Sequence, residues 1–300
     1  MTSSVLWADR GQSLALDGAS MGSGRRSLAI ARAAAMQLQA PWFSIWLQVR
    51  GSTRVSAREG GFELSVGDWI ALDPGAHPRL QAGRGALTVG LALPPELVRE
   101  LQLARDCLLY AGRGHIARRE RLTALRLWRN VGRSDLPPAA AGATRLRSPL
   151  DSFVHYLAQT HPGLLRELER CPGKSHWRKQ QVFARLQRAR LYLEGHADRI
   201  VSLAELAQLT SFSSWYLSKT YQATYGETLQ AASRRVRMAR ACRLLERTGM
   251  SIEDVAASCG FGSPSSFARA FRSELGVTST GYRSCRRHGG ELRPPLAVRA

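Results

Sequence analysis

Between residues 42 and 93 the apolar residues occur in short runs separated by turn residues. The runs read WFSIWLQVRG, TRVSA, FELSVGD, WIALDPG and GALTVGLAL, and turn pairs such as Gly60-Gly61 and Gly67-Asp68 fall among them. Strand-like runs with a turn roughly every 8–12 residues are typical of a small β-sandwich or barrel. The preceding residues, 1–40, are small and polar, and their segment GASMGSGRR predicts a flexible arm.

Helical spacing of apolar residues replaces the strand pattern after Pro94-Pro95. It recurs in segments near residues 97–108, 116–128, 150–157 and 164–168. Residues 132–144, GRSDLPPAAAGAT, predict a linker, and residues 171–176, CPGKSH, predict a hinge before the last part of the chain. The pattern leaves open whether a dimer seam or an intramolecular core is formed by Trp128, Leu150, Leu157 and Leu168.

From about residue 177 the chain predicts short helices with recognisable ends. Ser202 and Glu205 form the S-x-x-E pattern of a capping box, and Ser251 with Asp254 begins another helix in the same way. Between them an apolar stripe predicts a longer helix, which Gly249 would cap at its carboxyl end. The stripe consists of Met238, Ala241, Cys242 and Leu245.

Residues 252–275 combine a short helix, a glycine turn and a second helix. Gly260 suits the left-handed turn, Ser263 offers an N-cap, and Pro264 suits the first helical position. The second helix has a buried face of Phe267, Phe271 and Leu275. Its opposite face carries Ser265, Ala268, Arg269 and Arg272. These are the parts of a helix-turn-helix.

Residues 203–223 repeat this plan. A helix over residues 203–209 is followed by the turn Thr210-Ser211-Phe212 and by a second helix that starts near Ser213 or Ser214. The second helix is expected to bury Leu217 and Tyr221. Its outward residues would be Trp215, Ser218 and Lys219.

The segment from Gln181 to Arg283, about a third of the chain, resembles the DNA-binding domain of the AraC/XylS transcriptional regulators. The stretch SIEDVAASCGFGSPSSFARAFRSELGVTSTGYR agrees at nearly every fixed position with the family pattern S-I-x-x-[VI]-A-x-x-x-G-F-x-x-x-S-x-F-x-R-x-F-[KR]-x-x-x-G-x-[ST]-P-x-x-[YF]-R. The chain departs from the family at Ser279 for proline, Tyr221 for phenylalanine, Ser211 for glycine or asparagine, and Ala231 or Ala232 for an aromatic residue. These departures indicate a looser first half of the domain.

The resemblance implies two helix-turn-helix units, 203–223 and 252–275, joined by a long helix at about Thr228 to Thr248. A helix of roughly 20 residues spans about 30 Å, close to the ~34 Å between successive major-groove faces of B-DNA. The residues that the resemblance places on DNA are Trp215, Ser218, Lys219, Pro264, Ser265, Ser266, Ala268, Arg269 and Arg272. Of these, Arg269 is expected to read a guanine edge and Ser266 to lie nearer the backbone.

The front strands and the helices after them are similar to the cupin-like effector and dimerisation domain that many relatives carry. The predicted fold is therefore α+β, with an N-terminal cupin-like β-barrel with helices and a C-terminal all-α domain of two helix-turn-helix units joined by a long helix. The expected divisions are a flexible arm (1–40), the cupin-like domain with a helical extension (41–170), a linker (171–180), the DNA-binding domain (181–285) and a tail (286–300).

The charge of the chain favours a polyanionic partner. Its 300 residues include 43 Lys and Arg against 23 Asp and Glu, a formal charge of +20, which suits nucleic acid or, less often, an anionic membrane surface. No apolar stretch approaches the ~20 residues of a membrane span. The predicted long helix is rich in arginine, and its residues either contact phosphate or form a solvated face. They are Arg234, Arg235, Arg237, Arg240, Arg243 and Arg247.

Residues that suit other chemistry are few. The strand region contains one histidine, His77, whereas a cupin enzyme needs several around a metal, so the sequence predicts no metal site and no cofactor. An effector pocket could be lined by Trp42, Trp46, Trp69 and His77, although the tryptophans also suit a plain core. The five cysteines form no C-x-x-C pair, which predicts a reduced cytoplasmic protein, and Cys107, Cys242 and Cys259 read as buried residues.

These observations predict a transcription regulator that binds double-stranded promoter DNA in the cytoplasm, in association with the nucleoid. By resemblance it would be an activator that contacts RNA polymerase, forms a homodimer and responds to a small organic effector. Two alternatives stay open. One is control by a protein partner or by abundance, without a small ligand. The other is an enzyme tethered to DNA by its helical domain, which would need a reactive cysteine that residues 1–177 do not offer.

Overall fold

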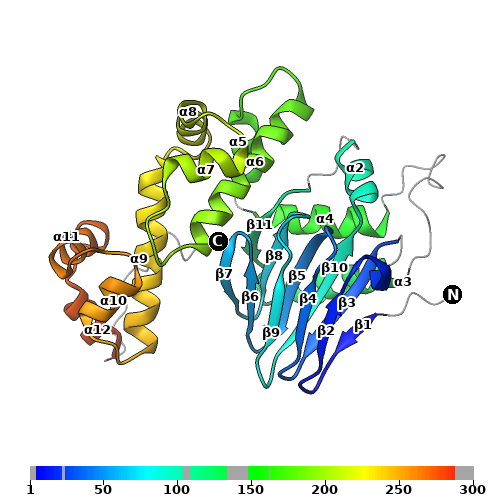
Figure 1. Ribbon diagram of the computed structural model, residues 1–300, viewed down its shortest axis with the longest axis horizontal. Coiled ribbons are helices and arrows are strands. Elements are labelled where there is room, and N and C mark those ends of the chain that lie inside the picture. The colour runs from blue at the N-terminus through cyan, green and yellow to red at the C-terminus, as the bar shows by residue number, and fades with distance from the viewer. Residues whose placement is uncertain (1–4, 22–23, 104–108, 134–147, 162, 288–300) are drawn as a thin grey trace. The chain divides into compact units, whose positions relative to one another are not determined.

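The computed structural model describes residues 5–21, 24–103, 109–133, 148–161 and 163–287 (Figure 1). The chain divides into two compact units, an N-terminal unit, Met1–Leu191, and a C-terminal unit, Tyr192–Ala300. The division falls within helix α6 (His176–Gly195), so most of that helix belongs to the N-terminal unit.

Two β-sheets form the body of the N-terminal unit. Sheet A has the strand order β1 (Leu6–Ala8), β3 (Arg26–Ala31), β10 (Leu87–Leu93), β5 (Phe43–Arg50), β8 (Asp68–Leu72) and β11 (Gly112–His115). Sheet B has the order β2 (Ser13–Leu16), β4 (Ala35–Leu38), β9 (Arg79–Ala82), β6 (Thr53–Ala57) and β7 (Gly60–Leu64). The pairs β1–β3 and β2–β4 are parallel, and the other described pairs are antiparallel. The described strands therefore form two separate sheets rather than a closed barrel.

Apolar side chains of both sheets fill the space between them. Trp46 of β5 and Ile70 of β8 pair across neighbouring strands and belong to this core, together with Met36 and Leu80 of sheet B. Successive side chains of a strand point to opposite faces. Ile45 of β5, with Trp69 and Ala71 of β8, therefore lies on the outer face of sheet A.

Residues 5–21 and 24–40 belong to this sandwich. The strands β1 to β4 all lie within them, and α1 (Gly18–Met21) lies within the glycine-rich segment. Leu28 and Ile30 of β3 are fully buried in the core. The expectation of a flexible arm is therefore wrong. These strands contain mostly Ala, Ser and Leu, with few of the β-branched and aromatic residues that mark a strand.

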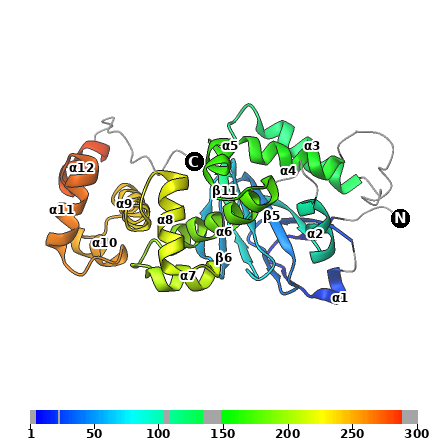
Figure 2. The ribbon, with the colours of Figure 1, turned by 90° about the horizontal axis from the view of Figure 1, so that it is seen from above.

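After strand β10 the N-terminal unit contains the helices α2 (Pro95–Leu103), α3 (Arg121–Arg133), α4 (Pro149–Gln159), α5 (Leu164–Arg170) and α6. Helices α3 and α4 pack on sheet A. Figure 2 shows α3 and α4 side by side along the strands. The indole of Trp128 donates to the Gly90 carbonyl (2.8 Å), and Leu150, Leu157 and Leu168 are buried within the single chain. These residues therefore form an intramolecular core. Residues 134–144 of the expected linker lie outside the described residues.

The described part of the C-terminal unit is helical, as predicted. Beyond the end of α6 it consists of α7 (Leu203–Thr210), α8 (Ser214–Tyr225), α9 (Leu229–Arg247), α10 (Ile252–Ser258), α11 (Pro264–Leu275) and α12 (Ser279–Arg287). Across the residues that the structure describes, no helix is long and apolar enough to cross a membrane.

Gly90 of β10 lies directly over the ring of Trp46. A Cβ at position 90 would lie 2.5 Å from Trp46 Cε3, and the fully buried indole has no free space to enter. We expect Gly90→Ala to lower the free energy of unfolding by about 1–3 kcal/mol, measured by urea denaturation. Gly85→Ala is the control, because a Cβ there meets no atom within 4 Å. Equal losses in the two variants would contradict this packing.

Candidate nucleic-acid interface

The second helix-turn-helix consists of α10 and α11 joined by a tight turn. Gly260 has φ = +69°, the left-handed conformation that glycine adopts without strain. The Ser263 hydroxyl accepts a hydrogen bond from the Ser266 amide (3.2 Å), and Pro264 is the first residue of α11, as the sequence predicts. The turn and the cap fix where α11 begins and which of its faces is exposed.

α11 presents a polar face to solvent. Its opposite residues Phe267 and Phe271 are fully buried in the core of the domain. Ser266 is half-buried, and its hydroxyl donates to the Ser263 carbonyl (2.8 Å), so its side chain serves the N-cap turn. The other candidate contact residues of this helix are exposed: Pro264, Ser265, Ala268, Arg269 and Arg272.

The first helix-turn-helix, α7 and α8, presents a smaller face. Trp215 is 69% exposed, and the Lys219 ammonium lies over its ring, 4.8 Å from the ring centroid. Ser218 is half-buried beside them. Leu217 and Tyr221 are fully buried on the inner side, as the pattern predicts.

Ser211 makes the turn of this first unit. It adopts φ = +54°, a conformation that is strained for a residue with a Cβ, and closes the carboxyl end of α7 through its amide. This is the position where the related pattern has glycine or asparagine. The turn geometry is therefore kept although the favoured residue is absent.

α9 is the predicted connector. It runs unbroken over the 19 residues Leu229–Arg247, between the N-cap Thr228 and the C-cap Thr248. Gly249 does not cap it, because the helix ends in an extended Thr248 whose hydroxyl donates to the Leu244 carbonyl (2.7 Å). In Figures 1 and 2, α9 lies between α8 and α11.

Most of the α9 arginines bond within the C-terminal unit. Arg234 pairs with Glu274 (3.2 Å) and Arg235 with Glu227 (2.7 Å). Arg237 is 8% exposed and donates to the carbonyls of Cys259 (3.4 Å) and Gly260 (3.2 Å).

Arg240 donates from Nε to the Ser258 carbonyl (3.1 Å). Arg243 and Arg247 are exposed. The sequence predicts that the six arginines contact phosphate or form a solvated face. This is wrong for Arg237, which is buried, and it omits the partners of Arg234, Arg235 and Arg240. The pattern of apolar positions on α9 does not reveal partners on other elements.

The loop before the first helix-turn-helix lies against the second helix-turn-helix at Gly260. A Cβ there would lie 2.7 Å from Arg199 Cα and 2.8 Å from the Asp198 carbonyl oxygen, in the loop before α7. Arg199 in turn pairs with Glu205 (Nη1 to Oε2, 3.0 Å), which lowers the pKa of that carboxyl to about 2. Ser202 caps α7 as predicted, but the Glu205 carboxylate binds Arg199 and Tyr192 rather than completing a capping box.

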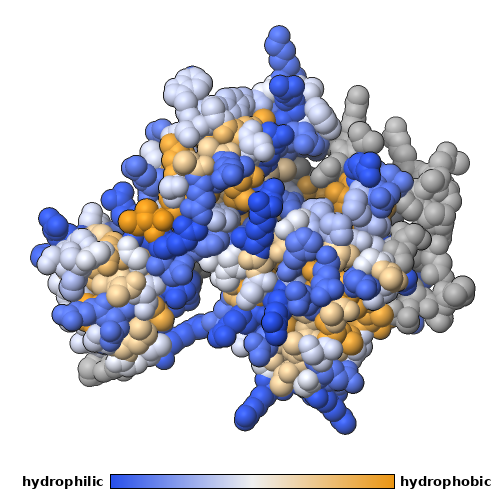
Figure 3. All heavy atoms as spheres, in the orientation of Figure 1, coloured by the Kyte–Doolittle hydropathy of each residue, from blue (hydrophilic) through white to orange (hydrophobic). Residues whose placement is uncertain are grey.

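Hydrophilic residues cover much of the visible face of the molecule in Figure 3, with apolar areas between them. The exposed charged residues of the interface, Lys219, Arg269 and Arg272, are basic. A basic polar face on each of two helices suits a polyanion.

The four candidate effector residues do not share one pocket. Trp42 and Trp46 belong to the core between the sheets. Trp69 lies on the outer face of sheet A, where its indole donates to Thr160 Oγ1 (2.8 Å). His77 is exposed in a loop at φ = +45°. The interpretation as a common pocket is therefore wrong, because alternation along the strands separates the tryptophans.

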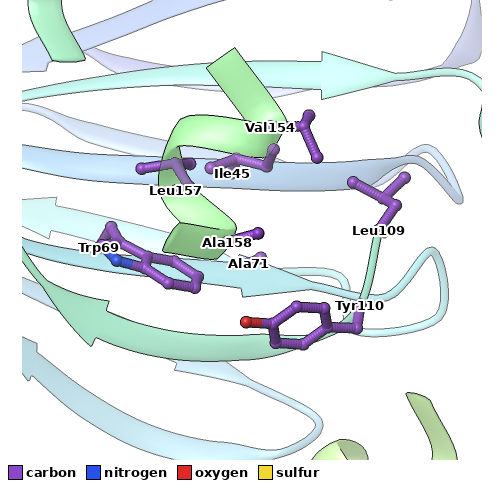
Figure 4. Close-up of a pocket in the computed structure, with 8 residues that line it drawn as sticks. All are labelled: Ile45, Trp69, Ala71, Leu109, Tyr110, Val154, Leu157 and Ala158. Carbon is purple, nitrogen blue, oxygen red and sulfur yellow. The ribbon is translucent and has the colours of Figure 1, made fainter. Parts of the chain in front are cut away.

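A cavity of about 20 Å³ lies between α4 and the outer face of sheet A (Figure 4). Trp69 and Tyr110 contribute its aromatic rings. The remaining lining residues are apolar: Ile45, Ala71, Leu109, Val154, Leu157 and Ala158. The volume holds about one water molecule.

Two hydrogen bonds and an ion pair lead from this cavity to α6. Tyr110 Oη lies 3.0 Å from His161 Nδ1, and His161 Nε2 donates to Glu167 Oε2 (3.0 Å). The other carboxylate oxygen of Glu167 lies 3.7 Å from Arg190 Nη1. Burial raises the pKa of the Tyr110 hydroxyl, which therefore stays protonated.

The described residues offer no group of three or more His, Cys, Asp or Glu side chains placed to hold a metal ion. Cys242 and Cys259 are buried, as predicted, and burial raises the pKa of each thiol to about 11. Thiols with such pKa values are unreactive at neutral pH. Cys107 lies outside the described residues.

Comparison with known proteins identifies relatives of the C-terminal unit. Residues 206–284 match a family model described as a helix-turn-helix domain. The transcriptional regulator Rob of Salmonella typhimurium is 32% identical over 109 residues, 36% of this chain and 38% of Rob. The HTH-type transcriptional activator AarP of Providencia stuartii is 30% identical over 93 residues, 31% of this chain and 69% of AarP.

Among solved structures, the DNA-binding domain of the global transcriptional factor AdpA, in complex with a target DNA, is similar at 26% identity. The match covers 35% of this chain and 94% of that chain, with a TM-score of 0.33. The chain therefore spans most of AarP but little more than a third of Rob.

We expect Gly260→Ala to destabilise the C-terminal unit by about 3 kcal/mol. The new methyl group would meet backbone atoms of Asp198 and Arg199, and the left-handed φ adds strain. Urea denaturation followed by circular dichroism measures the loss. The matched control is Gly262→Ala, where a Cβ meets nothing within 4 Å. A mild effect, equal to that of the control, would show that the loop of Asp198 and Arg199 does not pack against residue 260.

Proposed function

The chain belongs to the AraC/XylS family of transcriptional regulators, and on this premise we propose that it binds double-stranded DNA sequence-specifically and regulates transcription at promoters. One observation carries the proposal. Two N-capped helices, α8 and α11, each expose a polar face with a basic residue while burying the other face, and one unbroken helix joins them.

The connector length supports binding on one side of the duplex. At 1.5 Å per residue, the 19 residues of α9 span about 28 Å, against about 34 Å for one turn of B-DNA. The placement of α8 and α11 beside α9 would have to supply the remaining distance. Each helix would then enter one of two successive major grooves.

Within this proposal the two helices read DNA differently. Arg269 matches the O6 and N7 acceptors of guanine with its planar fork. Pro264 and Ala268 carry no side-chain donor, so they make apolar or shape contacts, with Ser265 and Arg272 beside them. From α8 the contacts come from Trp215, Ser218 and Lys219. On α11, Ser266 belongs to the N-cap turn and would lie near the DNA backbone.

Arg269→Ala should weaken binding to the preferred site by about 1–3 kcal/mol and relax the preference at one base pair. The loss arises because the exposed guanidinium is removed without disturbing the buried face of α11. The site is first selected by the wild-type protein from random-sequence DNA, and affinities are then measured by fluorescence anisotropy at fixed salt. Arg243→Ala, at an exposed position of α9 outside both helices α8 and α11, is the control. An unchanged base preference in Arg269→Ala would remove this residue from direct readout.

We further propose that the N-terminal sandwich is the cupin-like effector and homodimerisation domain of the family resemblance, and that the chain activates transcription through RNA polymerase. The space between the sheets is filled by buried side chains such as Trp46, Met36 and Phe62. The cavity at Trp69 and Tyr110 is therefore the better candidate binding site for a small apolar effector. Helix α4 would have to move to admit it. The bonds from Tyr110 through His161 and Glu167 to Arg190 would pass that movement to α6.

A small apolar or aromatic effector bound at this cavity should raise the melting temperature. At a ligand concentration of about 100 times Kd the gain is about 2.7 kcal/mol. The measurement is a thermal-shift screen of small organic compounds against wild type and Ala158→Val, which narrows the cavity. The compound that stabilises wild type should lose its effect in the variant. A screen without stabilising compounds would favour control by a protein partner or by abundance.

A further inference from the structure

Arg237 lies in the middle of α9, yet its side chain is removed from solvent. Only 8% of the residue is exposed, whereas Arg234 on the same helix is exposed and paired with Glu274. Nη1 of Arg237 donates to the carbonyls of Cys259 and Gly260, and the guanidinium carbon lies 4.4 Å from the centroid of the Phe261 ring. The side chain therefore reaches from the connector to the turn of the second helix-turn-helix.

The charge of Arg237 is balanced without an acid. Within the described residues no carboxylate forms an ion pair with it, and burying a guanidinium without compensation is costly. Carbonyls at the carboxyl end of a helix carry partial negative charge, and an aromatic face attracts a cation. Here these groups are the end of α10 and the ring of Phe261. The compensation holds only while the turn keeps its present geometry.

The contact continues into the recognition helix. The Phe261 ring meets the Phe267 ring edge to face (5.3 Å), and Phe267 packs on Phe271 (5.4 Å) within the buried face of α11. Arg240 adds a second bond from α9, to the Ser258 carbonyl at the end of α10. Displacing the Arg237 guanidinium would release both the turn and the first aromatic ring beneath α11.

The first helix-turn-helix is held in another way. Its turn residue Ser211 bonds back to α7 through its amide, and the loop before α7 is held by Arg199 and Glu205. Among the described contacts of Arg237, none involves α7 or α8. A change at Arg237 therefore acts directly on the turn that begins α11, and it reaches the first helix-turn-helix only through the loop of Asp198 and Arg199 that lies against Gly260.

We infer that Arg237 is a positioning residue for α11: it sets the placement of the second recognition helix through the α10–α11 turn and does not itself touch DNA. This inference rests on the proposed function. It predicts that the two halves of the DNA site respond differently to substitution of Arg237. The half read by α11 should lose base discrimination, and the half read by α8 should keep it.

The experiment uses the full chain and the DNA site selected by the wild-type protein. Every base pair of the site is changed singly, and the affinity loss is measured for wild type, Arg237→Met and the control Arg243→Met. Arg269→Ala and Lys219→Ala identify which half each recognition helix reads. For wild type, a mismatch typically costs roughly 5-fold to 150-fold in affinity. In Arg237→Met this penalty should fall to about twofold in the α11 half and stay unchanged in the α8 half.

The salt dependence of binding separates positioning from phosphate contact. Loss of a phosphate contact lowers the slope of log affinity against log salt by about 0.9, whereas loss of positioning by a residue away from DNA leaves the slope of the α8 half unchanged. The slope is therefore measured for wild type and Arg237→Met on DNA that carries only the half of the site read by α8. A reduced slope there, or equal loss of discrimination in both halves, would overturn the inference.

Arg237→Lys and Phe261→Leu replace Arg237→Met if that variant does not fold. Lysine keeps the charge but cannot bridge two carbonyls with a planar fork, and leucine removes the ring beneath the guanidinium. Each should reduce discrimination in the α11 half alone, and full discrimination in both would reject the inference. Failure of the wild type to select any site would instead reject the proposed function.

Discussion

The backbone at residue 260 is where the parts of the C-terminal unit meet. Its φ of +69° turns the chain from α10 into α11, the loop of Asp198 and Arg199 lies where a Cβ would be, and its carbonyl accepts from Arg237 of α9. The loop before the first helix-turn-helix, the connector and the second helix-turn-helix are thereby in contact at one glycine. Their arrangement rests on this contact as well as on the length of α9, since a connecting helix fixes a distance but not a rotation about its own axis.

The positive charge of the chain is used in two ways that composition does not separate. Four of the six α9 arginines bind acidic side chains or helix-end carbonyls within the unit. They hold helices together and contribute to the field around the protein, but part of their hydrogen-bonding capacity is used within the C-terminal unit. The exposed charges on the two recognition helices are few. A formal charge of +20 therefore supports attraction to a polyanion, but it does not give the number of side chains that would contact one.

The C-terminal helices could be predicted from sequence because their ends are marked by local chemistry. Ser202, Ser251 and Ser263 cap helices where the pattern placed them, and a period of 3.6 assigned Phe267 to the core. The contacts at Gly260 and Arg237 could not be found in this way, because their partners lie on other helices. Glu205 illustrates the limit. Its spacing from Ser202 fits a capping box, but the nearby Arg199 offers its carboxylate a stronger, charged partner.

The N-terminal unit was less predictable. Strands rich in aromatic and β-branched residues, such as β5 and β6, are clear in the pattern. The strands β1 to β4, β9 and β11 consist largely of small or polar residues, and only tertiary pairing defines them. The separation of Trp46 from Trp69 follows from alternation along neighbouring strands. That result needs the strand register, which composition does not supply.

The stacked pair of Trp215 and Lys219 bears on how α8 would meet a partner. A lysine side chain normally samples many rotamers, and ordering it on binding costs entropy. With the ammonium resting on the indole one helical turn away, part of that freedom is already lost in the unbound protein. If α8 binds DNA as proposed, this pair would therefore lose less side-chain entropy on binding than a lysine that is free in solvent.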